Sequence, residues 1–234
     1  MQRGIVPFCL AFSTISVINL LYHKVMIYDI TRTVSAHTKV WPGDTPFSAT
    51  PVLWLEAGNP VNLFTLTLSP HTGTHSDAYY HFDPNGAFPV DMPLDLYIGP
   101  ARVVTVAKSN GMILPEDFAQ VNLTGTKRLL IHTPVSELAD DVWPEEFPSL
   151  SVPFIEWCSR LGIALIGIDS PSIDAFDSTK LPCHHALRQA NMVNLETLCL
   201  RGVPDGEYEL IALPLKLAAV CGSPVRAILR TLAK

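Results

Sequence analysis

One segment of the chain concentrates side chains that bind metals and move protons. Residues 70–82 read PHTGTHSDAYYHF and hold three of the chain's eight histidines within eleven residues. Neutral imidazoles and a carboxylate are ligands that zinc and manganese prefer. The offsets between His71, His75, Asp77 and His81 are all even, so an extended backbone would put the four side chains on one face. Gly73 would let the backbone bend where two ligands must converge.

This pattern predicts a catalytic metal site. Three protein ligands on one ion leave a position for water, and the ion lowers the pKa of that water toward about 7. Hydroxide then becomes available at neutral pH, and the ion can also polarise a substrate carbonyl. A fourth histidine that is not needed as a ligand is a natural proton shuttle. The competing interpretation, a row of polar side chains on an exposed strand, does not explain why the four residues cluster.

A second group of possible ligands lies downstream, at Cys183-His184-His185 and at Glu196. Neighbouring residues of a helix point roughly 100° apart, because one turn takes about 3.6 residues. His184 and His185 therefore cannot both face one site. Taken alone, this group is better explained as two histidines at the end of a helix and a surface glutamate.

Composition restricts the class of protein. The 234 residues are 48% hydrophobic and 16% charged, with 16 Lys+Arg against 22 Asp+Glu and a formal net charge of −6. This fits one globular domain with a large core and excludes a disordered chain. We expect no nucleic-acid partner, because there is no basic excess to neutralise phosphates.

The cysteines point to a reducing compartment. There are five of them, widely spaced and without a CxxC pair, so a disulfide framework is not expected and the cytoplasm is the favoured location. We expect each to be a buried apolar thiol, because no basic neighbour is evident in the sequence.

Short β-rich runs and a few helices predict a strand-rich α/β domain with the helices outside. The expected strands are Met26–Ile30, Val61–Leu68, Ala101–Val106, Leu129–His132, Ala164–Ile168, Tyr208–Pro214 and Val225–Leu232. The expected helices are Pro115–Gln120, Val152–Leu161 and Cys183–Gln189.

Residues 1–25 form a separate N-terminal extension in this prediction. Gly4 to Tyr22 carry no charge, which suits a signal segment or a membrane anchor, but polar residues dilute the stretch and no cleavage site follows it. We favour Met26 as the natural start, with an ordered part of the fold as the remaining alternative. The domain is then residues 26–234, with no membrane contact expected.

These motifs carry a family resemblance. His71–Phe82 resembles the HxGTHxDxPxH signature of the Putative cyclase family, in which bacterial kynurenine formamidases are found. Further stretches are similar to that family from end to end of the domain: Met26–Asp44 with Trp-Pro-Gly-Asp at 41–44, Leu96–Val104, Gly167–Asp174, Asp177–His185 and Val193–Leu200. Residues 1–25 have no counterpart.

The resemblance implies a fold, an activity and roles. The fold would be a single swivelling β/β/α domain, and the assembly a homodimer. Two divalent metal ions, zinc or manganese, would be held by His71, His75 and Asp77 on one side and by Asp77, His184 and Glu196 on the other. His81 would be the general acid and base, and Trp41 would contact the substrate. The reaction would be hydrolysis of N-formyl-L-kynurenine to L-kynurenine and formate in tryptophan degradation.

Two rival functions remain beside this hypothesis. One is a different metal-dependent amidohydrolase of the same family, such as a hydrolase of cyclic amides like isatin. The other is a non-catalytic metal-binding protein. Tyr79 departs from the family's proline; its phenol is expected to be a packing group unless it faces the pocket, where it would alter substrate choice.

Overall fold

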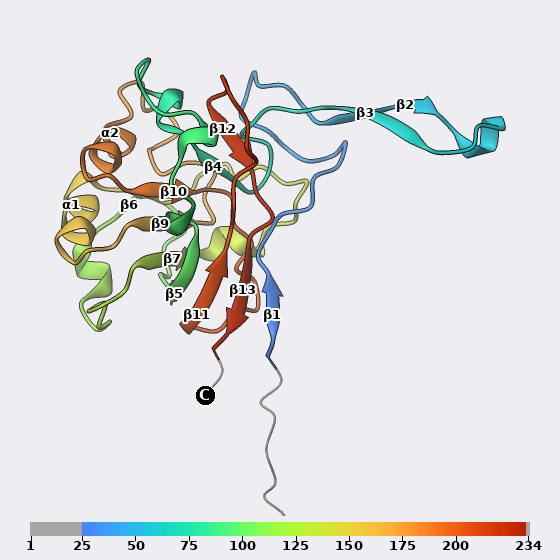
Figure 1. Ribbon diagram of the computed structural model, residues 1–234. Coiled ribbons are helices and arrows are strands. Elements are labelled where there is room, and N and C mark those ends of the chain that lie inside the picture. Colours follow the sequence, from blue (N-terminus) through green and yellow to red (C-terminus); the bar gives the residue numbers. More distant parts are fainter. Residues whose placement is uncertain (1–24, 233–234) are drawn as a thin grey trace, which may run out of the picture.

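A seven-stranded mixed sheet lies at the centre of the protein (Figure 1), which we describe from a computed structural model over residues 25–232. Across the sheet the strands are β1 (Ile27–Asp29), β13 (Ile228–Thr231), β11 (Gly206–Ile211), β5 (Ile98–Thr105), β7 (Arg128–His132), β9 (Leu165–Ile168) and β10 (Val193–Leu195). Neighbours from β1 to β5 pair antiparallel, and those from β5 to β10 pair parallel. The strand-rich α/β prediction is confirmed, and six of the seven expected strands lie in this sheet.

Both faces of the sheet are buried, because alternate side chains along each strand enter different clusters. On β7, Leu130 joins one apolar cluster while Leu129 and Ile131 join the other. Gly167 of β9 lies opposite Leu130, and a Cβ at Gly167 would come within 2.5 Å of the Leu130 side chain. The close fit fixes the register of the parallel strands, whose ends carry the site.

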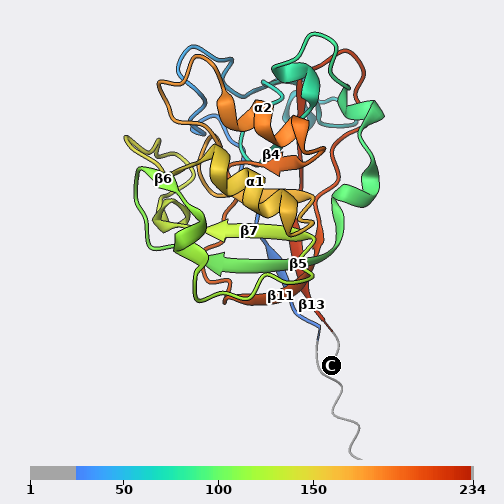
Figure 2. The ribbon, with the colours of Figure 1, turned by 90° about the vertical axis from the view of Figure 1, so that its left-hand side faces the viewer.

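Two helices cover one face of the sheet (Figure 2). Helix α1 (Val152–Arg160) begins where the Ser151 side chain accepts a hydrogen bond from the Phe154 amide, and it ends before Gly162, which has a φ of +78°. Helix α2 (Pro182–Gln189) begins with proline in its first turn. The expected helix at 115–120 is instead a short 3-10 turn.

Smaller elements surround this frame. Three further two-stranded pairs are β4 (His75–Asp77) with β12 (Gly222–Pro224), β6 (Met112–Ile113) with β8 (Ser149–Leu150), and β2 (Ser48–Leu53) with β3 (Leu63–Thr67). The 3-10 helices are η1 (Leu55–Ala57), η2 (Tyr79–His81), η3 (Pro89–Asp91), η4 (Leu94–Leu96), η5 (Pro115–Phe118) and η6 (Pro134–Glu137).

The β2–β3 hairpin, which with η1 we call the arm, projects away from the body (Figure 1). It carries seven exposed large apolar side chains: Val52, Trp54, Leu55, Val61, Leu63, Phe64 and Leu66.

The predictions for residues 1–24 lie outside the described part of the chain. Within residues 25–232, no helix has both the length and the apolar character needed to cross a bilayer.

Candidate metal centre

The segment that holds the histidines does not run as one strand. Only His75 and Asp77 lie in a strand, β4, where the alternation puts them on one face. His71 lies in a turn closed by the bond from the Thr72 amide to the Ser69 carbonyl, and Gly73 follows with a φ of +66°. His81 ends η2. The prediction that all four side chains share one face of an extended strand is therefore wrong. A turn positions His71 and a 3-10 helix positions His81 beside the two residues of β4.

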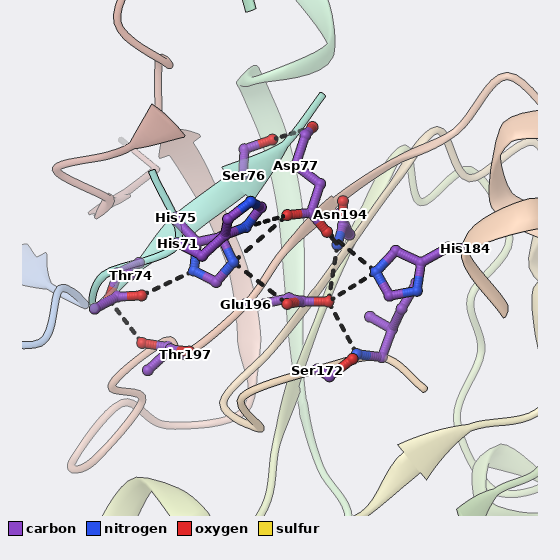
Figure 3. A network of polar contacts seen from close by, with 12 residues as sticks. His71, Thr74, His75, Ser76, Asp77, Ser172, His184, Asn194, Glu196 and Thr197 are labelled. Atoms are coloured by element: carbon purple, nitrogen blue, oxygen red, sulfur yellow. Dashed lines mark hydrogen bonds and ion pairs between the residues drawn. The ribbon is translucent and has the colours of Figure 1, made fainter. Parts of the chain in front are cut away.

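Glu196 and His184 reach the same place from other elements. Glu196 directly follows β10 and exchanges backbone hydrogen bonds with His75, at 3.3 and 3.0 Å. His184 lies in the first turn of α2, with its ring buried, whereas His185 is exposed. The structure thus brings together His71, His75, Asp77, His184 and Glu196, the five residues that the family resemblance implies as ligands (Figure 3).

The donor atoms fall into two groups joined by the carboxylates. Asp77 Oδ1 lies 2.9 Å from His71 Nδ1 and 3.5 Å from His75 Nε2, whereas Asp77 Oδ2 lies 3.1 Å from His184 Nε2. Glu196 is divided in the same way, with Oε2 3.4 Å from His75 Nε2 and Oε1 3.5 Å from His184 Nε2. In Figure 3 the two carboxylates lie between the histidine pair and His184.

This geometry fits metal ions. Bonds of about 2.0–2.1 Å in a tetrahedral arrangement hold neighbouring ligand atoms about 3.3–3.4 Å apart. Most of the donor separations lie close to that spacing. Asp77 Oδ1 is moreover buried and receives no hydrogen bond of acceptable geometry among the described residues. A buried carboxylate oxygen that lies beside histidine nitrogens but accepts no well-aligned hydrogen bond suits a cation better than it suits the apolar interior.

The remote nitrogens of two histidines are held by oxygen atoms. His75 Nδ1 lies 2.9 Å from the Gly73 carbonyl, and His184 Nδ1 lies 2.7 Å from Asp174 Oδ2. Asp174 also accepts the Cys183 and His184 amides, so one buried carboxylate fixes both the start of α2 and the direction of the ring. Partners of this kind are typical of metal-ligating histidines.

Asn194 fixes the carboxylates. Its amide nitrogen lies 2.8 Å from Asp77 Oδ2 and 2.9 Å from Glu196 Oε1, and Glu196 Oε1 also accepts the Ile173 amide at 2.9 Å. Neither Asp174 nor Asn194 was assigned a role from the sequence.

Electrostatics couple the five residues. Burial alone would raise the pKa of Asp77, but contacts with His184, His71 and His75 hold it well below its usual value. Burial and the charge of Asp77 both raise the pKa of Glu196, yet contacts with His184 and His75 keep it lowered. Both carboxylates are therefore ionised at neutral pH.

The pKa values of the three ligand histidines are shifted upward. Burial opposes their charged form, but contacts with Asp77 and Cys221 raise the pKa of His71 to about 10, and contacts with Asp77 and Glu196 raise that of His75 to about 9. Burial is likewise outweighed at His184, where Asp174, Asp77 and Glu196 raise the pKa well above its usual value. Without a metal, all three imidazoles are therefore in the cationic form at pH 7, with a proton on each ring nitrogen.

His81 lies beside this centre and is exposed. Its ring centroid is 4.2 Å from that of His71 and 6.0 Å from that of His184. It forms no ion pair with Asp77 among the described residues, and it lines the cavity described below.

Cys221 is a further residue at the centre to which the sequence did not point. Its Sγ lies 3.2 Å from His71 Nε2, and donor atoms of His71, His81 and Cys221 all lie within 4.8 Å of one another. Hydrogen bonds from His71 and His81 lower its pKa to about 6. The expectation of an inert thiol is therefore wrong here, whereas it holds for Cys158 and Cys183, whose pKa values are raised by burial. No signal could have found the pair, since 150 residues separate its members.

A cavity of about 340 Å³ opens onto the centre, a size typical of small-molecule sites. His71, His75, His81, His184 and Glu196 line its base, and Trp41 and Trp143 line its wall. Trp41 packs edge-on against Trp143, with 5.7 Å between ring centroids, and at a tilt of 32° against exposed Phe176, with 5.0 Å between centroids. The cavity thus combines an aromatic wall with a polar base.

Tyr79 does not line this cavity. Its hydroxyl donates to the Met192 carbonyl at 2.9 Å, and the Arg188 guanidinium lies 4.9 Å from its ring centre. It is a packing residue, as expected.

Comparison with known proteins identifies the family. The profile of the Putative cyclase family matches residues 28–175. A kynurenine formamidase from Salinibacter ruber is 44% identical over 208 residues, which cover 87% of this chain and 97% of that protein. The chain belongs to the Putative cyclase family.

Solved structures of cyclase-family type share the fold. A potential metal-dependent hydrolase with cyclase activity superposes with a TM-score of 0.78 at 25% identity, over 90% of this chain and all of that one. Isatin hydrolase A from Labrenzia aggregata, bound to benzyl benzoate, gives a TM-score of 0.76 at 23% identity, over 89% and 94% of the two chains. At that identity the second likeness shows the fold alone.

Proposed function

We propose that this protein is a metal-dependent kynurenine formamidase, which hydrolyses N-formyl-L-kynurenine to L-kynurenine and formate. The 44% identity to the Salinibacter ruber enzyme, over nearly the whole of that protein, carries the proposal. The ligand set with its aromatic cavity supports it.

In this proposal His71, His75 and Asp77 hold one divalent ion, and Asp77, His184 and Glu196 hold a second. When bound, the two ions supply a polarised formyl carbonyl and a water that is acidic enough to attack it at neutral pH. Zinc suits the imidazole-rich donor set, and manganese is the alternative.

The chain's own residues supply the remaining steps. Trp41 stacks on the aryl ring of the substrate and holds the formamide over the base of the cavity. Water adds its oxygen to the formyl carbon, and the bond from that carbon to the aryl nitrogen breaks. His81 takes one proton released by the water and gives it to the departing nitrogen, so that the free arylamine and formic acid are formed; the acid then loses its proton to solvent and leaves as formate.

Lys39 and Asp44 suit the other end of the substrate. Among the described residues that line the cavity, they are the two charged side chains outside the donor cluster. N-Formylkynurenine carries an α-carboxylate and an α-ammonium group, so one cation and one anion at the mouth are complementary to it. Isatin is neutral and has no group for either.

The test is direct hydrolysis of N-formyl-L-kynurenine, with isatin and formanilide as comparison substrates and with a chelator as control. We expect chelator-sensitive turnover that prefers formylkynurenine. Lys39→Met removes an exposed cation whose pairing with the α-carboxylate is worth at most about 1 kcal/mol, so KM for formylkynurenine should rise by up to about fivefold and that for formanilide should not change. Lys216→Met, an exposed lysine outside the cavity, is the matched control. Turnover of isatin but not of formylkynurenine by folded, metal-loaded protein would refute the proposal.

The same proposal includes a homodimer formed through the arm. A two-stranded hairpin is marginally stable in water, and this one exposes apolar side chains on both faces. A second copy of the chain would cover these apolar side chains, because a two-fold symmetric arrangement buries both arms at once. We also propose a reducing, cytoplasmic location, since the cysteines of residues 25–232 are all free.

A further inference from the structure

The three histidines of the metal centre differ in one respect, the partner of the remote nitrogen. His75 and His184 each have an oxygen acceptor there, the Gly73 carbonyl and the Asp174 carboxylate. For His71 the atom in that place is the Cys221 sulfur, 3.2 Å from Nε2.

The orientation of the His71 ring sets the tautomer. Nδ1 faces Asp77 Oδ1 at 2.9 Å, on the side of the first donor group, and Nε2 faces away toward Cys221. If Nδ1 gives its lone pair to a metal, the ring proton must sit on Nε2. That N–H then points at Sγ, which accepts it.

The sulfur is held in place by the strand pair that carries the ligands. The Cys221 carbonyl accepts the Ala78 amide at 3.0 Å, and Gly222, the next residue, lies opposite Asp77 in the β4–β12 register. A Cβ at Gly222 would come within 3.0 Å of the His71 ring, so glycine lets the strand approach it. Cys221 is thus seated against His71 by the backbone rather than by a mobile loop.

We propose that Cys221 is a positioning residue of the metal centre, which fixes the ring and tautomer of His71 by accepting its Nε2–H. This inference rests on the proposed metal centre, not on the identity of the substrate. The sulfur acts through His71 and is not itself a ligand. Loss of such an outer partner costs about 10–100-fold in metal affinity.

The experiment compares Cys221→Ala and Cys221→Ser with Cys199→Ala, a half-buried cysteine whose amide bonds to the Ile30 carbonyl. Zn²⁺ affinity is measured by competition with a chromophoric chelator, and Co²⁺-loaded proteins are examined by absorption spectroscopy. We expect Cys221→Ala to weaken one of two Zn²⁺ ions by about 10–100-fold, Cys221→Ser to recover part of that loss, and Cys199→Ala to bind as the wild type does.

Two results would overturn the inference. One is unchanged affinity for both ions in folded Cys221→Ala, or in Cys221→Ser should the alanine variant not fold. The other is an intense sulfur-to-cobalt charge-transfer band in the wild type that disappears in Cys221→Ala, because that band would make the sulfur a ligand. Neither readout uses a substrate, so failure of the formamidase assay would leave both outcomes interpretable.

Discussion

Loading the centre with metal should expel protons, and the number of protons follows from the structure. His71 and His75 have pKa values of about 10 and 9, and that of His184 is well above its usual value, so each imidazole holds an extra proton in metal-free protein at neutral pH. Asp77 and Glu196 are already ionised. A histidine must be neutral to bind a metal, so each ligand histidine releases one proton.

The expected release is therefore about three protons for two divalent ions near pH 6, where water on the metal would keep its own protons. The sign follows from the raised pKa values. Protonated imidazoles compete with metal below pH 9, so affinity must rise with pH through the neutral range. Three protons correspond to about a 1000-fold change in the combined binding constant per pH unit, or roughly 4 kcal/mol.

Isothermal titration calorimetry of metal-free protein in buffers with different ionisation enthalpies counts these protons. His81→Ala and His185→Ala should release the same number as wild type, because neither residue is a proposed ligand. A release of one proton or fewer near pH 6 would show that the imidazoles are neutral before loading, and the argument from their carboxylate partners would fail.

Three further predictions concern single parts of the protein. His81→Ala should lower kcat by about 10²–10⁴-fold while dialysed protein keeps its metal by elemental analysis, with exposed His185→Ala as control; near-normal turnover would remove His81 from the mechanism. Asp174→Asn keeps the shape of the side chain but removes the charge 2.7 Å from His184 Nδ1, so chelator competition should show about 10–100-fold weaker binding of one metal. Asp117→Asn is the control and should leave metal affinity unchanged, because the Asp117 carboxylate accepts hydrogen bonds from Lys108 and the Leu114 amide instead. Leu63→Lys with Leu66→Lys should convert the proposed dimer to a folded monomer in light scattering, whereas Leu94→Lys with Leu215→Lys, two exposed leucines outside the arm, should leave it dimeric.

The local part of the site could be predicted from the sequence because four of its residues lie within one short segment. The residue types were enough to indicate a metal, although the reason given for their convergence was wrong. An even spacing predicts one face only if the backbone stays extended, and Gly73, at a φ of +66°, bends it after His71. The residue types still indicate a metal although the expected backbone path was wrong. The chemistry depends on the final positions of the side chains and not on the path of the chain between them.

The contacts between site residues that lie far apart in the sequence could not be derived from spacing alone. Cys221 and Asp174 contact His71 and His184 through the order of strands and the start of a helix, which no local pattern encodes. The tertiary fold also decided that Trp143 lines the cavity and that Lys39 and Asp44 supply its outer charges.

The choice between His184 and His185 shows how the fold resolves what helical periodicity alone leaves open. Helical geometry says only that the two rings point about 100° apart. Asp174 settles which ring turns inward, because it accepts the Cys183 and His184 amides at the start of α2 and the Nδ1 of His184 as well. Those three bonds fix the rotation of the helix about its axis and the direction of one ring together. His184 Nε2 then faces both carboxylates, and His185 is left exposed beside Phe82, at 5.5 Å between ring centroids.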